Sequence, residues 1–252
     1  MSSELQQPAS IQDPSEYSVP WTVFDAWLGV VMLAMIDAIL LILALRGSKA
    51  ELVQSAGIVF LELAYLLPVV LIFAWRRIHW KYLGFRKFGS KVMGLGCGLL
   101  IGGYAVILLH NFILLKLGID TQGESILRLI EMLESPGWFF LVGIVFAPFV
   151  EEIFFRGFLF QGFRQKYGWV SAMLLSSAVF AAAHLDPVSL IPTFILGLVL
   201  AYLYHRSNSL WPGIILHFLI NGSSLCALFA STRLPPEYFS KLWLICRSLI
   251  PL

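Results

Sequence analysis

The sequence predicts an all-α fold, a polytopic transmembrane helical bundle of about seven to eight helices with an interfacial amphipathic helix and a re-entrant loop. The first observation is composition: of 252 residues, 59% are hydrophobic and 13% are charged, whereas soluble domains carry about 25% charged residues. The second is that the mean hydropathy is +0.83 and that the apolar residues fall in long runs. The formal net charge of +2 is too small to indicate nucleic acid as a partner.

The N-terminal segment, residues 1–20, differs from the rest of the chain. It is polar, carries acidic residues, and contains no lysine or arginine. A secretory signal would begin with a positively charged region, so we expect a disordered tail that is not cleaved. Residues 21–252 are then expected to form a single transmembrane domain.

Seven apolar runs follow the tail, and a span of about 20 residues crosses the ~30 Å hydrocarbon core. They cover residues 24–45, 56–75, 92–115, 138–163, 170–184, 190–205 and 211–230, and an apolar end at 238–252 could add an eighth. Between the third and fourth runs, residues 124–134 place apolar side chains on one helical face and charged ones on another. This segment is expected to lie in the interface as an amphipathic helix.

The links between the runs predict the orientation. Residues 76–91 hold six basic side chains among aromatic ones, which is typical of a cytoplasmic loop that lies against lipid headgroups. The turns at Arg164 and Arg206 then lie inside as well, whereas the links after Lys116 and His184 lie outside. We therefore expect a multi-pass integral protein of a bacterial-type plasma membrane or an organelle equivalent, with membrane lipid as a partner.

Three charged residues interrupt the apolar run at 137–161, namely Glu151, Glu152 and Arg156. Charges at this depth cost several kcal/mol unless they are paired or hydrated, so they indicate function. Glu152 and Arg156 are four residues apart with the acid on the N-terminal side, the favourable order for an ion pair on a helix. Glu151 points to another face and stays free to act.

Two later runs carry further polar residues at the same spacing. His184 follows Phe180 by four residues, and Asn221 follows His217 by four. The run that ends at His184 has only about fifteen residues, short of the ~20 needed for a full crossing. The apolar loop after His184 is therefore expected to re-enter the bilayer and to bring this histidine toward Glu151, beside a cavity.

These side chains are suited to amide hydrolysis. A buried carboxylate beside a histidine can polarise a water that attacks a carbonyl, and a second histidine with an asparagine can stabilise the oxyanion. A metal-dependent version is also open, because Glu151, His184 and His217 would be a set of ligands for a divalent ion such as zinc, with one position left for water.

The three motifs, Glu-Glu-x-x-x-Arg at 151–156, Phe-x-x-x-His at 180–184 and His-x-x-x-Asn at 217–221, resemble those of the CPBP family of intramembrane proteases. That family, also called the Abi or CAAX-protease and bacteriocin-processing family, includes the type II CAAX prenyl endopeptidases. The resemblance covers about 138–230, the expected catalytic core.

The resemblance implies a role for each matching residue. Glu151 would be the general base that activates water together with His184, and His217 with Asn221 would stabilise the oxyanion. Glu152 and Arg156 would orient the site. The implied partner is a peptide or protein substrate, which in part of the family is prenylated, and the family is described both as glutamate-based and as metal-dependent.

Two other functions remain open from the sequence. Asp37 and Glu62 lie inside apolar runs, and buried carboxylates of this kind could form the relay of a proton-coupled transporter. Against this, the two halves of the chain show no internal repeat or matching broken helices. The third possibility is a catalytically silent membrane scaffold that keeps the fold and binds a partner.

Overall fold

The computed structural model describes residues 18–46, 62–121, 123, 126 and 137–233, and these form helices and turns without any strand. The predicted all-α class is confirmed. The order of elements is α1 (Val23–Arg46), α4 (Leu67–Arg76), η2 (Trp80–Leu83), α5 (Ser90–Lys116), α7 (Gly137–Leu141), η3 (Val142–Phe146), α8 (Ala147–Glu151), η4 (Glu152–Phe160), α9 (Gln161–Ala183), α10 (Leu190–Ser207) and α11 (Trp211–Arg233).

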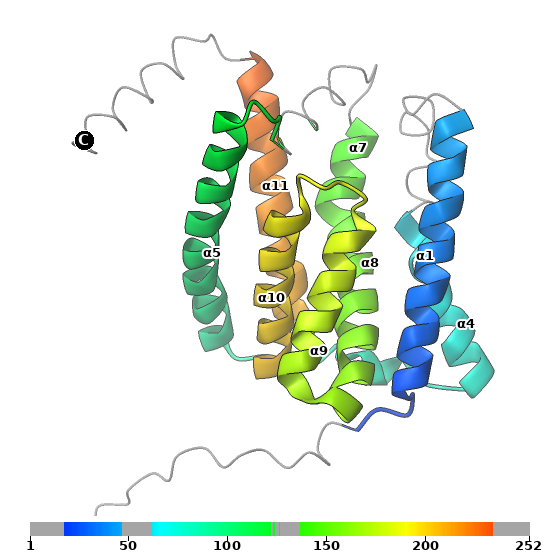
Figure 1. The fold of residues 1–252 in the computed structure, drawn as a ribbon. Helices are drawn as coiled ribbons and strands as arrows, with labels where there is room; N and C mark the ends of the chain where they lie inside the picture. The colour runs from blue at the N-terminus through cyan, green and yellow to red at the C-terminus, as the bar shows by residue number, and fades with distance from the viewer. Residues whose placement is uncertain (1–17, 47–61, 122, 124–125, 127–136, 234–252) are drawn as a thin grey trace, which may run out of the picture.

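The helices stand side by side in one bundle (Figure 1). Within the described ranges, three helices are long and apolar enough to cross a membrane: Val23–Ile42, Ser90–Lys116 and Leu190–Ser207. Beside these three helices stand α9, α11 and the continuous helical stretch from α7 to η4. Several predicted segments lie partly or wholly outside the described residues: 1–17 of the tail at 1–20, the first part of the run at 56–75, most of the amphipathic segment at 124–134 and the apolar end at 238–252.

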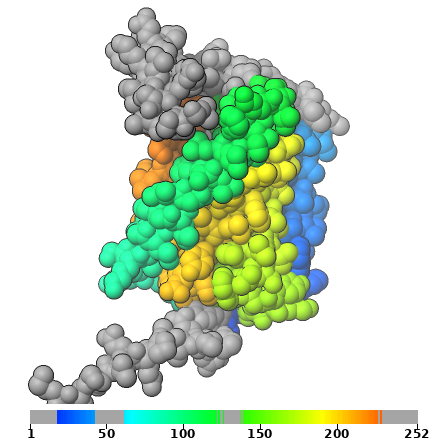
Figure 2. Space-filling view, turned by 60° about the vertical axis from the view of Figure 1, so that its left-hand side comes forward, coloured from blue at the N-terminus to red at the C-terminus, as the bar shows by residue number. Residues whose placement is uncertain are grey.

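Helix α5 crosses the bundle obliquely over α10 (Figure 2). Glycines permit this close approach. A Cβ added at Gly96 would lie 2.9 Å from Leu203 of α10, and one at Gly103 would lie 3.0 Å from Ile195. The small residues of α5 thus set its distance from the site-bearing part of the bundle.

The fourth run is helical but not a regular α-helix. Residues Val142–Phe146 (η3) and Glu152–Phe160 (η4) are π-helical, a form that often occurs as a local bulge at functional sites. The chain stays helical as far as Gly168, whose φ of 76° breaks the helix inside α9. The rest of α9 runs back in the opposite direction to η4 and ends at Ala183, with His184 as its C-cap. Regular spacing arguments did not predict the π-helical segments.

The connection between α9 and α10 is short and lies below the upper ends of α1, α5, α7 and α11 (Figure 1). Ser189 donates a hydrogen bond to the Asp186 carbonyl, and the Val188 amide donates to the Asp186 carboxylate. Leu185 adopts a left-handed φ of 50°. These contacts order the link locally, and the predicted re-entry of this loop into the bilayer stays a prediction.

Candidate active site

Glu152 and Arg156 form the ion pair that their spacing predicts. Arg156 Nη1 lies 2.8 Å from Glu152 Oε1, and both residues are 0% exposed. The guanidinium also donates to the Gly197 carbonyl at 3.3 Å and stacks over the Phe180 ring at 4.4 Å from its centroid. A buried pair of this kind is held by its surrounding contacts, because desolvation otherwise offsets much of the attraction.

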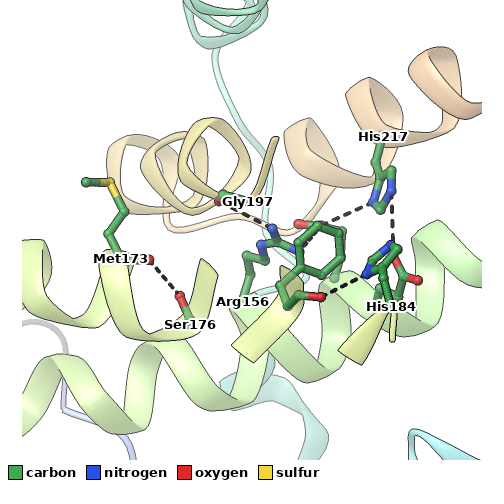
Figure 3. A network of polar contacts seen from close by, with 9 residues as sticks. Arg156, Met173, Ser176, His184, Gly197 and His217 are labelled. Carbon is green, nitrogen blue, oxygen red and sulfur yellow. Dashed lines mark hydrogen bonds and ion pairs between the residues drawn. The ribbon is translucent and has the colours of Figure 1, made fainter. Parts of the chain in front are cut away.

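His217, labelled in Figure 3, makes a contact with the carboxylate of each of the two glutamates. Its Nε2 is 3.6 Å from Glu151 Oε2, and its Nδ1 is 3.5 Å from Glu152 Oε1. All three side chains are buried. Glu152 therefore has two partners, Arg156 and His217, and it links the ion pair to the reactive part of the site.

Gly213 makes room for this arrangement. It precedes His217 by one helical turn on α11, and a Cβ at this position would collide with Glu152 Oε2. Sequence reasoning missed Gly213. The available signal was a glycine four residues before a motif histidine, which places it on the same helix face.

We expect Gly213→Ala to reduce activity and to destabilise the fold by about 1–3 kcal/mol, the usual cost of overpacking. The added methyl group would push Glu152 away from His217. Gly222→Ala on the same helix is the matched control, since its Cβ would meet Ile144 at an ordinary 3.5 Å. Unfolding and cleavage assays would compare the two variants, and equal behaviour would contradict the packing argument.

His184 is held at the C-terminal end of α9. Its Nδ1 lies 2.9 Å from the Phe180 carbonyl oxygen. A carbonyl can only accept, so Nδ1 carries the proton and Nε2 keeps a lone pair in the neutral ring. The ring also packs edge-on against Phe180 at 4.9 Å. Phe180 contacts Arg156, His184 and His217 and so packs the site.

One cavity of about 450 Å³ gathers the predicted residues. Glu151, His184, His217 and Asn221 all line it, together with mostly apolar side chains from α5, α10 and α11. Glu151 Oε2 is buried and has no hydrogen-bond partner among the described residues. Asn221 donates one amide hydrogen to the Gly143 carbonyl of η3 at 2.9 Å, which fixes the side chain and leaves its second N–H.

The sequence left open a metal site made by Glu151, His184 and His217. Among the described residues, no group of three or more His, Cys, Asp or Glu side chains is arranged to hold a metal ion. Glu151 and His217 approach each other directly, but His184 shares the cavity without completing a ligand set with them. As arranged here, the three residues do not fit a zinc site.

Of the two carboxylates that suggested a transporter, Glu62 lies close enough to Glu151 for the two to interact electrostatically. Asp37 of α1 is buried and accepts a hydrogen bond from the Tyr65 hydroxyl at 2.8 Å. Glu62 Oε2 is buried without a hydrogen-bond partner in the described part of the chain. Neither residue lines the cavity that holds the histidines.

Comparison with known proteins agrees with the motifs. Residues 133–223 match the sequence model of the family described as type II CAAX prenyl endopeptidase Rce1-like. The chain is 28% identical over 104 residues to the "Putative membrane peptidase YdiL" of Bacillus subtilis, a match that covers 41% of this chain and 43% of that protein. The chain thus aligns with less than half the length of that relative.

Two further relatives match over longer stretches. An "Uncharacterized 24.3 kDa protein" of Escherichia coli is 27% identical over 183 residues, which cover 70% of this chain and 80% of that protein. The "UPF0177 protein YxdF" of Lactococcus lactis is 29% identical over 185 residues, which cover 68% of this chain and 98% of that protein. No solved structure matches the chain. The family resemblance predicted from the three motifs is confirmed, since residues 133–223 of this integral membrane protein are similar to the type II CAAX prenyl endopeptidases.

Proposed function

We propose that the protein is an intramembrane endopeptidase that hydrolyses a peptide bond of a membrane-associated substrate. The observation that carries the proposal is that Glu151, His184, His217 and Asn221 line one buried cavity. The family match over residues 133–223 supports a peptidase. Asp37 and Glu62, on which the transporter alternative rests, do not line this cavity.

In the proposed reaction, Glu151 and His184 activate one water. The free carboxylate oxygen of Glu151 accepts a proton from the water, and Nε2 of neutral His184 accepts the hydrogen bond from its other O–H. The water oxygen bonds to the substrate carbonyl carbon, and the carbonyl oxygen becomes an oxyanion. Glu151 then passes its proton to the leaving nitrogen as the C–N bond breaks.

His217 and Asn221 are the proposed oxyanion donors. Nε2 of His217 lies 3.6 Å from Glu151 Oε2, beyond hydrogen-bond distance, and when it carries the ring proton it can donate to an oxyanion in the cavity. Asn221 retains one N–H after its bond to Gly143. Donors fixed in advance stabilise developing charge without reorganisation, and losing one typically costs about 10²–10³ in rate.

Glu152 and Arg156 position these groups. Arg156 holds Glu152, and Glu152 holds the Nδ1 side of His217. Glu151 ends α8 and Glu152 begins η4, and both carboxylates approach the same histidine.

The glutamate-based scheme predicts that chelation leaves the enzyme active. Incubation of purified protein with a strong zinc chelator is expected to leave the cleavage rate unchanged, because the described residues offer no three-ligand group. Metal analysis of the same sample should find no stoichiometric zinc. Loss of activity that added zinc restores would contradict the scheme and favour Glu151, His184 and His217 as ligands.

The proposed substrate is a peptide or protein segment that reaches the cavity from the membrane, and a prenylated chain is one member of this class. The cavity wall offers apolar side chains such as Leu100, Ile107 and Leu196 beside the polar groups, so it suits an apolar or lipid-modified segment.

The test is a comparison of membrane proteomes from cells with wild-type protein and with Glu151→Gln, reading newly formed C-termini. The proposal predicts peptides that end at new C-termini only in the wild type. Identical C-termini in both samples would remove the support for proteolysis.

A further inference from the structure

A second groove lies at the end of the bundle where α1 begins and α4 ends (Figure 1). It has a volume of about 580 Å³ and shares no lining residue with the catalytic cavity. Its lining includes four side chains that carry or can take a positive charge and two aromatic rings: Arg76, Arg77, His79, Lys81, Trp75 and Tyr82. Among the described residues, no acidic side chain lines it. The groove therefore offers positive charge and hydrogen-bond donors to an anion.

Two of the cations in the groove are free for a ligand. Arg76 is already engaged, because its Nε and Nη2 both lie 2.8 Å from Asp25 Oδ1. Asp25 is 0% exposed, and its other carboxylate oxygen accepts hydrogen bonds from the amide and the hydroxyl of Thr22. Arg77 and Lys81 are exposed and form no ion pair within the described part of the chain. Their charge is therefore not balanced inside the protein.

His79 adds a neutral donor beside these cations. The Lys81 amide donates to His79 Nδ1 at 3.1 Å, so Nε2 carries the proton in the neutral ring. The Lys81 ammonium lies 5.2 Å from the centre of the Tyr82 ring, a cation–π contact that holds it in the groove. The segment from Arg77 to Lys81 thus brings a guanidinium, an imidazole N–H and an ammonium into one groove. Guanidinium and ammonium groups are the usual protein ligands of phosphate.

An exposed apolar face of α4 leads into the groove. Four large side chains at spacings of three and four residues share this face and are exposed: Leu67, Val70, Leu71 and Trp75. The opposite face of α4 is buried. Trp75 ends the exposed face, is 69% exposed and also lines the groove, and tryptophan is typical of the headgroup level of a membrane. A ligand with an anionic head and an apolar tail would match the groove and this face together.

We propose that the groove binds one anionic phospholipid, with its phosphate held by Arg77, His79 and Lys81 and an acyl chain along the exposed face of α4. A soluble phosphate compound would use the groove but leave the apolar face uncovered. A zwitterionic lipid would bring its own cation toward two unbalanced positive charges, and like charges repel. The site contains no residue of the catalytic cavity, so it is independent of the proposed proteolysis.

The experiment measures lipid binding to the purified full-length protein in detergent. The protein is titrated with phosphatidylglycerol, with phosphatidylcholine, or with glycerol 3-phosphate, which has no acyl chain, and native mass spectrometry gives the Kd of the first bound molecule. The test variant combines Arg77→Gln with Lys81→Gln. Its matched control combines Lys87→Gln with Lys91→Gln, which removes the same charge from exposed positions outside the groove. Substitutions at exposed positions seldom impair folding, and thermal unfolding of both variants checks this.

We expect phosphatidylglycerol to bind the wild-type protein about tenfold more tightly than phosphatidylcholine. The loss of two basic side chains in Arg77→Gln with Lys81→Gln should weaken phosphatidylglycerol binding about 10- to 30-fold, and the control pair should change it by less than about threefold. Equal losses for the two pairs, or equal affinities of the wild type for the two lipids, would overturn the proposal. Binding of glycerol 3-phosphate as tight as that of phosphatidylglycerol would also overturn it, and would indicate a site for a soluble phosphate compound instead.

Discussion

Glu151→Gln is expected to lower the cleavage rate by about 10²- to 10⁴-fold, the usual contribution of a general base. The amide has nearly the same shape as the carboxylate but cannot take a proton from the attacking water. Glu151 Oε2 has no hydrogen-bond partner among the described residues, so the substitution should change the fold little. Initial rates on a cleaved membrane peptide would measure the effect.

The matched control is Asp37→Asn, a buried carboxylate of the same bundle whose replacement can still accept the hydrogen bond of Tyr65. It should cleave at the wild-type rate. If Asp37→Asn abolished activity while Glu151→Gln kept it, the assignment of the base would be wrong, and a relay through Asp37 would regain support.

Arg156→Met is expected to destabilise the protein by about 3–5 kcal/mol, because it leaves the Glu152 carboxylate buried without its partner. The substitution also removes the contacts of the guanidinium with the Gly197 carbonyl and the Phe180 ring. Activity should fall with it, since Glu152 would no longer be fixed beside His217. Denaturant unfolding in a defined lipid or detergent mixture would measure the loss.

Arg206→Met serves as the comparison, because Arg206 is exposed in the last turn of α10. Surface substitutions usually change stability by less than about 0.5 kcal/mol. Equal unfolding free energies for Arg156→Met and Arg206→Met would show that the buried ion pair does not hold the site together.

The residues of the candidate site could be predicted because residues four apart on one helix share a face, whatever the rest of the fold does. Spacing of four residues predicted the ion pair of Glu152 with Arg156, which the structure confirms, and it also brings His184 to the Phe180 carbonyl. For His217 and Asn221 the same spacing indicates only that both face one side of α11, and each then binds a different neighbour. The pattern thus predicted which residues share the cavity but not every partner.

Contacts between helices were not predictable from one sequence. The room that Gly213 leaves for Glu152 depends on how α11 meets η4, and the bond from Asn221 to Gly143 depends on the register of η3. The π-helical turns could not be predicted from the spacing of apolar residues either, because this buried run is apolar almost throughout. Such features follow from packing of distant segments, which sequence spacing does not encode.

The central claim is that Glu151 and His184 act together on one water. The most direct measurement compares the cleavage rates of Glu151→Gln, His184→Ala and the double variant under identical conditions. Residues that work as a unit lose most of the rate with the first substitution, so we predict that the double variant is about as slow as the slower single variant. Losses that multiply in the double variant would contradict the claim and would show that the two side chains act in separate steps.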